Sequence, residues 1–183
     1  MQGWFTSVWS EDNAQYILKF MEGAKKWGLH MQYIGGCWNE REYNRDWIVH
    51  TFRPLLNKSG FSHVKINAPE GSGKAWGIIE QLNKDTAFNN AVDVISYHYP
   101  VSYLYRDHKI NTPSGYAAYT KSKWSGEDFS LGGKSWFNAL YLACSVLECY
   151  LKLNIAKLNL CTPIASMPDN TCYSNTCIMK EAT

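Results

Sequence analysis

The sequence of 183 residues lacks an excess of charge of either sign, because 18 Lys and Arg residues stand against 16 Asp and Glu residues. Such a near balance provides no positive field for holding a nucleic acid, so nucleic-acid binding is not expected. The sequence also lacks a G-x-G-x-x-G fingerprint and a Walker loop, which weighs against the nucleotide-binding α/β folds. Five of its six cysteines lie in residues 144–183, but no histidine lies near them and their spacing does not match a zinc site.

The sequence also lacks an uninterrupted apolar run long enough to cross a membrane. The most apolar stretch, residues 140–160, contains Glu148, Lys152 and Lys157, so no integral membrane span is expected. The first residues carry no basic segment followed by an apolar run, so no signal peptide is expected in this chain. These absences leave the hydrophobic pattern, and the polar residues between its segments, as the informative features.

Aromatic residues are abundant, at 15% of the chain, with 8 Trp and 12 Tyr. Large rings mainly fill protein cores. A ring whose face is exposed in a cleft also suits a sugar, because the C–H face of a pyranose packs on an aromatic plane. The composition is therefore compatible with a carbohydrate-binding cleft, although it does not require one.

Helical and extended patterns alternate along the chain. Apolar residues at three- and four-residue spacing predict helices, and short apolar runs predict buried strands. The predicted helices cover residues 12–28, 43–58, 74–89 and a segment from 136 onward, and the predicted strands cover residues 31–38, 63–68, 92–99 and 123–129. This order is typical of βαβ units with a parallel sheet, either an open doubly wound sheet or a (β/α)8 barrel. A full barrel needs eight strands and about 250 residues, so the expected fold class is α/β, an incomplete (β/α)8 TIM barrel.

The first predicted helix shows clear helical periodicity. Tyr16, Ile17, Phe20, Ala24 and Trp27 recur at three- and four-residue spacing, which predicts a helix. Capping side chains stand at the start of the segment and a glycine at its end, which supports the predicted bounds.

Polar side chains follow each predicted strand at the point where it ends. The four segments are Trp38-Asn39-Glu40, Asn67-Ala68-Pro69-Glu70, Tyr97-His98-Tyr99-Pro100 and Gly126-Glu127-Asp128-Phe129. Reactive groups of parallel α/β folds collect at the carboxyl ends of the strands. Taken singly, Glu40 beside Arg41 is typical of a surface ion pair, Glu127 is typical of a helix-terminal charge, and a lone histidine such as His98 is usually structural. As a set at successive strand ends, these residues favour an active site.

Two carboxylates that face each other across a cleft are what hydrolysis of a glycosidic bond requires. One carboxyl group, kept protonated, donates its proton to the leaving oxygen. The other, ionised, attacks the anomeric carbon and forms a covalent glycosyl-enzyme that water then releases. Glu40 and Glu127 end strands that lie three apart in the predicted order, which suits opposite sides of a barrel mouth. The sequence therefore predicts a retaining glycoside hydrolase with these two glutamates as its catalytic pair.

Longer motifs around these glutamates resemble the galactocerebrosidase family. They are Tyr33-Ile34-Gly35 before Trp38-Asn39-Glu40-Arg41, Val92-Asp93-Val94-Ile95 before His98-Tyr99-Pro100, and Trp124-Ser125-Gly126-Glu127-Asp128-Phe129-Ser130. In order and spacing, the motifs are similar to that family over residues 14 to 142. The resemblance implies a partial barrel glycosidase domain at residues 1–142, comprising about strands 4 to 7 of a full barrel. Residues 143–183 are expected to form a divergent Cys-rich tail.

The resemblance also implies individual roles. Glu40, which follows an asparagine at the fourth barrel strand, would be the acid/base, and Glu127 at the seventh strand would be the nucleophile. Asn39, Trp38 and His98 would bind the substrate. No metal ion and no organic cofactor are implied. The expected substrate is a glycosphingolipid of the galactosylceramide type, the expected partner of the complete enzyme is a saposin, and the expected location is the lysosome.

Two alternatives stay open, because the prediction contains no counterpart of the family's first three barrel strands or of its eighth. Another two-Glu barrel β-glycosidase would carry the same Asn-Glu pair and the same distant glutamate. An inactive truncated fragment, or one that acts only in binding, would leave sheet edges unpaired and apolar faces uncovered. A panel of glycosides tests the first alternative, and measurements of unfolding and activity test the second.

Overall fold

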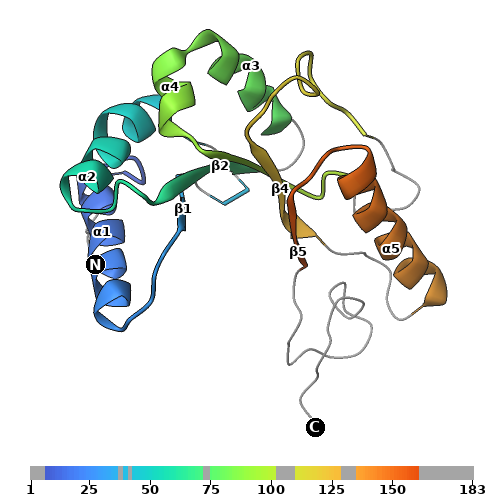
Figure 1. Ribbon diagram of the computed structural model, residues 1–183, viewed down its shortest axis with the longest axis horizontal. Coiled ribbons are helices and arrows are strands. Elements are labelled where there is room, and N and C mark those ends of the chain that lie inside the picture. Colours follow the sequence, from blue (N-terminus) through green and yellow to red (C-terminus); the bar gives the residue numbers. More distant parts are fainter. Residues whose placement is uncertain are drawn as a thin grey trace, which may run out of the picture.

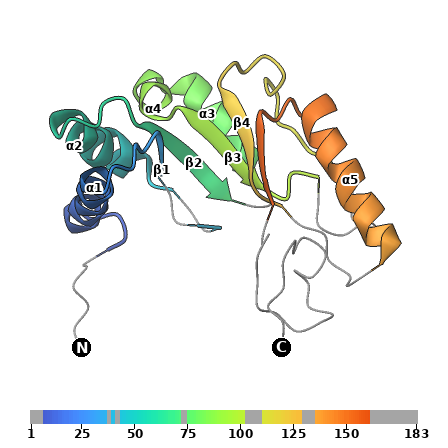
Figure 2. The same cartoon turned by 60° about the horizontal axis from the view of Figure 1, so that its bottom comes forward.

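The computed structural model shows a curved parallel sheet with helices on its outer side (Figure 1). The five strands are hydrogen-bonded to one another in chain order, and every neighbouring pair is parallel. Figure 2 shows the sheet as an open arch. The fold class predicted from the sequence, an incomplete (β/α) barrel, is confirmed. The structure describes residues 7–36, 39–40, 43–71, 75–101, 110–128 and 135–160.

All four predicted strands are present, and a fifth follows them. The strands are β1 (Tyr33–Gly35), β2 (Lys65–Gly71), β3 (Val94–His98), β4 (Ser122–Asp128) and β5 (Lys157–Leu160). The helices are α1 (Glu11–Lys26), a π-helical turn at Trp47–Phe52 that runs into α2 (Arg53–Lys58), a 3-10 turn at Ala75–Gly77, α3 (Ile78–Lys84), α4 (Thr86–Ala91) and α5 (Trp136–Leu151). Every residue of β3 is buried. This strand is the central one of the five and pairs with β2 on one side and with β4 on the other.

Helix α1 forms where the sequence predicts it, but a different face is buried. Its N-cap Ser10 accepts a hydrogen bond from the Asn13 backbone N–H at 3.2 Å. The buried residues are Ala14, Leu18, Met21 and Ala24, whereas Tyr16, Phe20 and Trp27 are 63%, 62% and 85% exposed. The three rings, whose spacing helped to predict the helix, therefore do not pack inward. Both faces of the helix have an apolar repeat of three and four residues, and periodicity alone does not distinguish the face that packs on the helices around Trp47.

The single helix predicted for residues 74–89 is divided at Asp85. The backbone of Asp85 is extended, and its side chain accepts a hydrogen bond from the Phe88 N–H at 2.9 Å, so it caps the start of α4. The Arg45 guanidinium and the N–H of Phe88 lower the pKa of Asp85 to about 2. The large apolar residues of this region, Trp76, Ile79, Leu82 and Phe88, are all buried.

The βα pattern continues past the predicted domain boundary at residue 142. Helix α5 spans that position, and β5 pairs in parallel with β4. No sequence pattern predicted β5, because only four residues form it and they lie shortly after the apolar helix α5. Residues 161–183, most of the predicted Cys-rich tail, lie outside the described residues. The separate origin of the tail stays a prediction.

Arg53, at the start of α2, links this helix to the residues that precede β2 and β3. Its guanidinium donates to the Val64 carbonyl at 2.9 Å and to the Ala91 carbonyl at 3.0 Å, and it forms an ion pair with Asp93. Asp93 also accepts from the Ile66 N–H at 2.9 Å. These contacts set α2 against the starts of β2 and β3, at the edge opposite the predicted site. Within the described residues, no helix combines the length and the hydropathy that a membrane span requires.

Candidate active site

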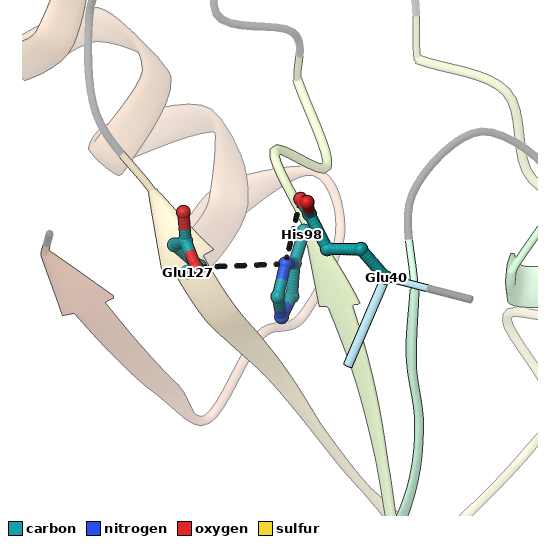
Figure 3. Close-up of side chains that lie close together, drawn as sticks. All are labelled: Glu40, His98 and Glu127. Atoms are coloured by element: carbon teal, nitrogen blue, oxygen red, sulfur yellow. Dashed lines mark hydrogen bonds and ion pairs between the residues drawn. The ribbon is translucent and has the colours of Figure 1, made fainter. Parts of the chain in front are cut away.

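The predicted site residues meet at the carboxyl edge of the sheet. Glu40 lies in the turn after β1, His98 is the last residue of β3, and Glu127 is near the end of β4. Figure 3 shows the three side chains pointing toward one another, with His98 between the two glutamates. The three strands are parallel members of one sheet, so residues that are far apart in sequence reach the same edge.

Irregular backbone aims these side chains. The strand register shifts between Pro69 and Gly71, between Tyr97 and His98, and between Ser125 and Asp128, always near the carboxyl edge. Such bulges bend a strand and redirect the side chains that follow.

Three non-glycine residues at this edge adopt left-handed backbone conformations, with φ of 55° at Glu40, 47° at Glu70 and 54° at Tyr99. Two backbone hydrogen bonds hold them, from the Glu40 N–H to the Glu70 carbonyl at 2.9 Å and from the Tyr99 N–H to the Glu127 carbonyl at 3.0 Å. Left-handed conformations in side-chain-bearing residues cluster at functional sites, where surrounding structure maintains them. The local backbone is therefore organised around this group of acids.

His98 is the centre of the cluster. Its side chain is 2% exposed, and its Nδ1 lies 3.2 Å from Glu40 Oε1 and 3.8 Å from Glu127 Oε2. Its Nε2 lies 3.0 Å from Glu70 Oε2. Burial lowers the pKa of His98, but the hydrogen bonds with Glu70 and Glu40 and the charge of Glu127 outweigh burial, so the pKa is raised above its usual value.

The two predicted catalytic carboxylates face each other across a short gap. Glu40, His98 and Glu127 each place one polar atom within 4.8 Å of the others, so a carboxylate oxygen of Glu40 lies no farther than that from one of Glu127. The side chain of Glu40 is 42% exposed and that of Glu127 is 25% exposed, which leaves both within reach of a ligand from solvent. In retaining glycosidases the two carboxyl groups lie about 5–5.5 Å apart, and in inverting enzymes about 6.5–9.5 Å.

The same three side chains have the spacing of a metal site. A histidine ligates a metal ion through a neutral imidazole. The raised pKa of His98 disfavours the neutral imidazole. Both ring nitrogens also lie within hydrogen-bond distance of carboxylates, so neither presents a free lone pair to a metal ion. The geometry suits acid–base chemistry better than metal coordination.

The predicted substrate-binding residues have different outcomes. His98 lies within the cluster, as described above. Asn39 is exposed in the turn that carries Glu40. Trp38 lies outside the described residues. The structure thus brings Glu40, His98 and Glu127 together, whereas the chemical role of each residue stays a prediction.

Sequence reasoning did not assign roles to four further residues of the cluster. Glu70 binds His98 and accepts a hydrogen bond from the Asn67 side chain, and the Tyr99 hydroxyl donates to Glu127 Oε1. A Cβ on Gly126 would come within 2.0 Å of Glu70 Oε2, so this glycine makes room for that carboxylate. The strand-end rule placed all four residues at the correct edge, but no sequence signal indicated the role of Gly126 or the bond between Asn67 and Glu70.

The chain is similar in sequence to a family of glycosyl hydrolases. Residues 1–183 match the family model described as Glycosyl hydrolase family 59. The galactocerebrosidase of Homo sapiens is 37% identical over 119 residues, which cover 64% of this chain and 16% of the human protein. The galactocerebrosidase of Salmo salar is 35% identical over 135 residues, which cover 69% of this chain and 18% of the salmon protein. The chain thus spans about a sixth of the length of the relatives it matches.

Two solved structures with a similar fold are those of xylanases. The catalytic domain of GH30 xylanase C from Talaromyces cellulolyticus has a TM-score of 0.60 and 16% identity, and the similarity covers 82% of this chain and 37% of that one. The glycoside hydrolase family 30 subfamily 8 xylanase from Clostridium acetobutylicum has a TM-score of 0.60 and 20% identity, with 85% and 40% covered. At these identities the similarity shows the fold alone. The match over the whole sequence decides the family: the chain belongs to glycosyl hydrolase family 59.

Proposed function

We propose that the protein is a retaining glycoside hydrolase that removes β-linked galactose from glycosphingolipids of the galactosylceramide type. Glu127 is the nucleophile that bonds to the anomeric carbon, and Glu40 is the acid/base that protonates the leaving oxygen and later activates water. Asn39, Trp38 and His98 line the sugar site. The substrate class rests on the relatives, which are named galactocerebrosidases and are 37% and 35% identical where they align.

One observation supports the reaction type above all others: carboxylate oxygens of Glu40 and Glu127 lie within 4.8 Å of one another. This upper bound on the oxygen–oxygen distance is compatible with the separation of about 5–5.5 Å between the carboxyl groups of retaining enzymes. Glu127 is held for this role by the Tyr99 hydroxyl on Oε1, and its Oε2 lies 3.8 Å from His98 Nδ1.

The experiment that tests the proposal is a panel of chromogenic β-galactosides, β-glucosides and β-xylosides with the purified chain, followed by detergent-dispersed galactosylceramide. We expect cleavage of β-galactosides, and NMR should show the β-anomer as the first product. An α-anomer as first product would refute the retaining mechanism. Preferential cleavage of another β-glycoside would instead support the first alternative, a two-Glu barrel glycosidase of different specificity.

The second alternative, a fragment that is inactive or acts in binding, is favoured by one structural observation. Large apolar side chains are exposed on the two outermost helices: Trp27 at the end of α1 is 85% exposed, and Trp136 and Leu151 of α5 are 78% and 80% exposed. Apolar surface of this kind typically binds a partner surface. Sedimentation, cooperative thermal unfolding and the activity panel together distinguish a monomeric enzyme from an associating, inactive chain.

The proposed substrate carries two further proposals. A glycosphingolipid is embedded in a membrane, so the enzyme would act together with a lipid-presenting saposin, and it would work in the lysosome, where such lipids are degraded. A co-sedimentation experiment with saposin and galactosylceramide vesicles tests the partner. Imaging of the tagged protein beside a lysosomal marker tests the location, and a uniformly cytosolic signal would refute it.

A further inference from the structure

The cluster contains a third carboxylate for which the two-glutamate mechanism has no use. Glu70 is part of β2, its side chain is 19% exposed, and its Oε2 lies 3.0 Å from His98 Nε2. Its other oxygen accepts a hydrogen bond from Asn67, a residue that is 6% exposed. Both oxygens of Glu70 are therefore fixed by hydrogen bonds. Because His98 lies between this carboxylate and Glu40, Glu70 can influence the reaction through His98.

We propose that Glu70 is a positioning residue that keeps His98 doubly protonated, so that His98 Nδ1 donates to Glu40 and does not take the proton that Glu40 delivers to the leaving oxygen. This inference rests on the proposed function, in which Glu40 is the acid. Glu70 itself does not touch the substrate.

The two protonation states of His98 have opposite consequences for Glu40. When both ring nitrogens carry a proton, Nε2–H donates to Glu70 and Nδ1–H donates to Glu40 Oε1 at 3.2 Å. The proton of Glu40 then resides on its other oxygen, from which it passes to the leaving oxygen as the glycosidic bond breaks and Glu127 bonds to the anomeric carbon. When His98 is neutral and Nε2–H stays with Glu70, the bare Nδ1 is an acceptor and binds the Glu40 proton.

The charges around His98 favour the doubly protonated state. The titratable groups that face it among the described residues are Glu40 from the turn after β1, Glu70 from β2, Glu127 from β4 and the phenol of Tyr99, whose ring meets the imidazole edge-on. While Glu40 is protonated for catalysis, Glu70 and Glu127 still provide two negative charges. Of these two, Glu70 is the nearer to the ring, at 3.0 Å against 3.8 Å.

The sheet is shaped to admit this carboxylate. A Cβ on Gly126 would come within 2.0 Å of Glu70 Oε2 and 2.3 Å of Ser96 Oγ, so Glu70 reaches His98 only because β4 has no side chain at that point. Gly126, next to the predicted nucleophile, thus leaves room for Glu70. A substitution at Gly126 would disturb the contact between Glu70 and His98 without removing the charge of Glu70.

The test uses the full chain and the substitution Glu70→Gln, with Glu70→Asp as the conservative variant and Glu80→Gln as a matched control on the exposed side of α3. The imidazole signals of His98, identified by their loss in His98→Gln, are titrated by NMR. We expect the pKa of His98 to fall by about one pH unit or more in Glu70→Gln, to stay raised in Glu70→Asp, and to be unchanged in Glu80→Gln.

The second readout is the pH profile of kcat/KM for β-galactosides with poor and good leaving groups. If His98 loses its proton at lower pH in Glu70→Gln, the alkaline limb of the pH profile should shift to lower pH by as much as the pKa of His98 falls. The shift should be largest for substrates with poor leaving groups, because these depend on proton donation. Recovery of activity at lower pH separates this effect from a loss of structure. An equal loss for both substrates at every pH, or an unchanged His98 pKa, overturns the inference.

Two controls keep the outcomes distinct. If Glu70→Gln does not fold, Gly126→Ala replaces it, and a His98 pKa that stays as in the original chain then overturns the inference. If the original chain cleaves no glycoside, the proposed function fails, and the NMR titration still decides whether Glu70 controls the proton on His98.

Discussion

Replacement of Arg53 by Met would show how strongly the helical layer is tied to the sheet. The Arg53 side chain is 15% exposed. Its guanidinium donates to the Val64 and Ala91 carbonyls and pairs with Asp93, whose side chain is 35% exposed. Met keeps the apolar stem but removes every donor. The Val64 and Ala91 carbonyls then lose the Arg53 donors, at about 1–3 kcal/mol for each group left unsatisfied in the interior, while Asp93 loses the ion pair and keeps the hydrogen bond from the Ile66 N–H.

Because water reaches Asp93, its share is discounted, and the expected loss in free energy of unfolding is about 2–4 kcal/mol. For a chain of this size the melting temperature should fall by about 10 °C. The matched control is Lys19→Met, since Lys19 pairs with Glu22 at 2.7 Å but the two side chains are 72% and 43% exposed. That change should cost about 0.5 kcal/mol or less.

Urea unfolding followed by circular dichroism measures both variants, and a double-mutant cycle with Asp93→Asn isolates the ion pair. We expect a coupling energy of about 1 kcal/mol or more between Arg53 and Asp93. If Arg53→Met is no more destabilising than Lys19→Met, the account of Arg53 as the tie between α2 and the strand starts is refuted.

The other predictions concern the reaction. Glu127→Gln should lower kcat by about 10³-fold or more for every leaving group, because the nucleophile is lost; retained turnover would remove Glu127 from the mechanism. Glu40→Gln should lower kcat/KM by about 10²–10⁴-fold for poor leaving groups and far less for good ones, and equal losses would contradict the acid role. Tyr99→Phe removes the hydroxyl that donates to Glu127 Oε1, so the nucleophile loses a hydrogen bond that holds it and kcat should fall by about 10-fold; an unchanged kcat would contradict that role. Tyr119→Phe, which loses a hydroxyl bound to Asn89 at 2.8 Å, should leave kcat unchanged.

Much of the architecture follows from local patterns in the sequence. Short apolar runs separated by amphipathic segments predicted β1 to β4 and the intervening helices, since burial on a parallel sheet demands that composition. Local signals failed where two patterns competed. Asp85 is a helix cap within a segment of continuous helical periodicity, and α1 carries two apolar repeats, of which the one with Ala14 and Leu18 packs.

By itself, the sequence determined that Glu40, His98 and Glu127 stand at the ends of parallel strands, because strand ends are marked by where an apolar run stops and polar residues begin. It did not determine which atoms meet. The hydrogen bond from His98 to Glu70, and the space above Gly126 that permits it, depend on register shifts in three strand pairs and on left-handed turns at single residues. Only the tertiary structure decides these, because a shift of one residue in register turns a side chain to the opposite face of a strand.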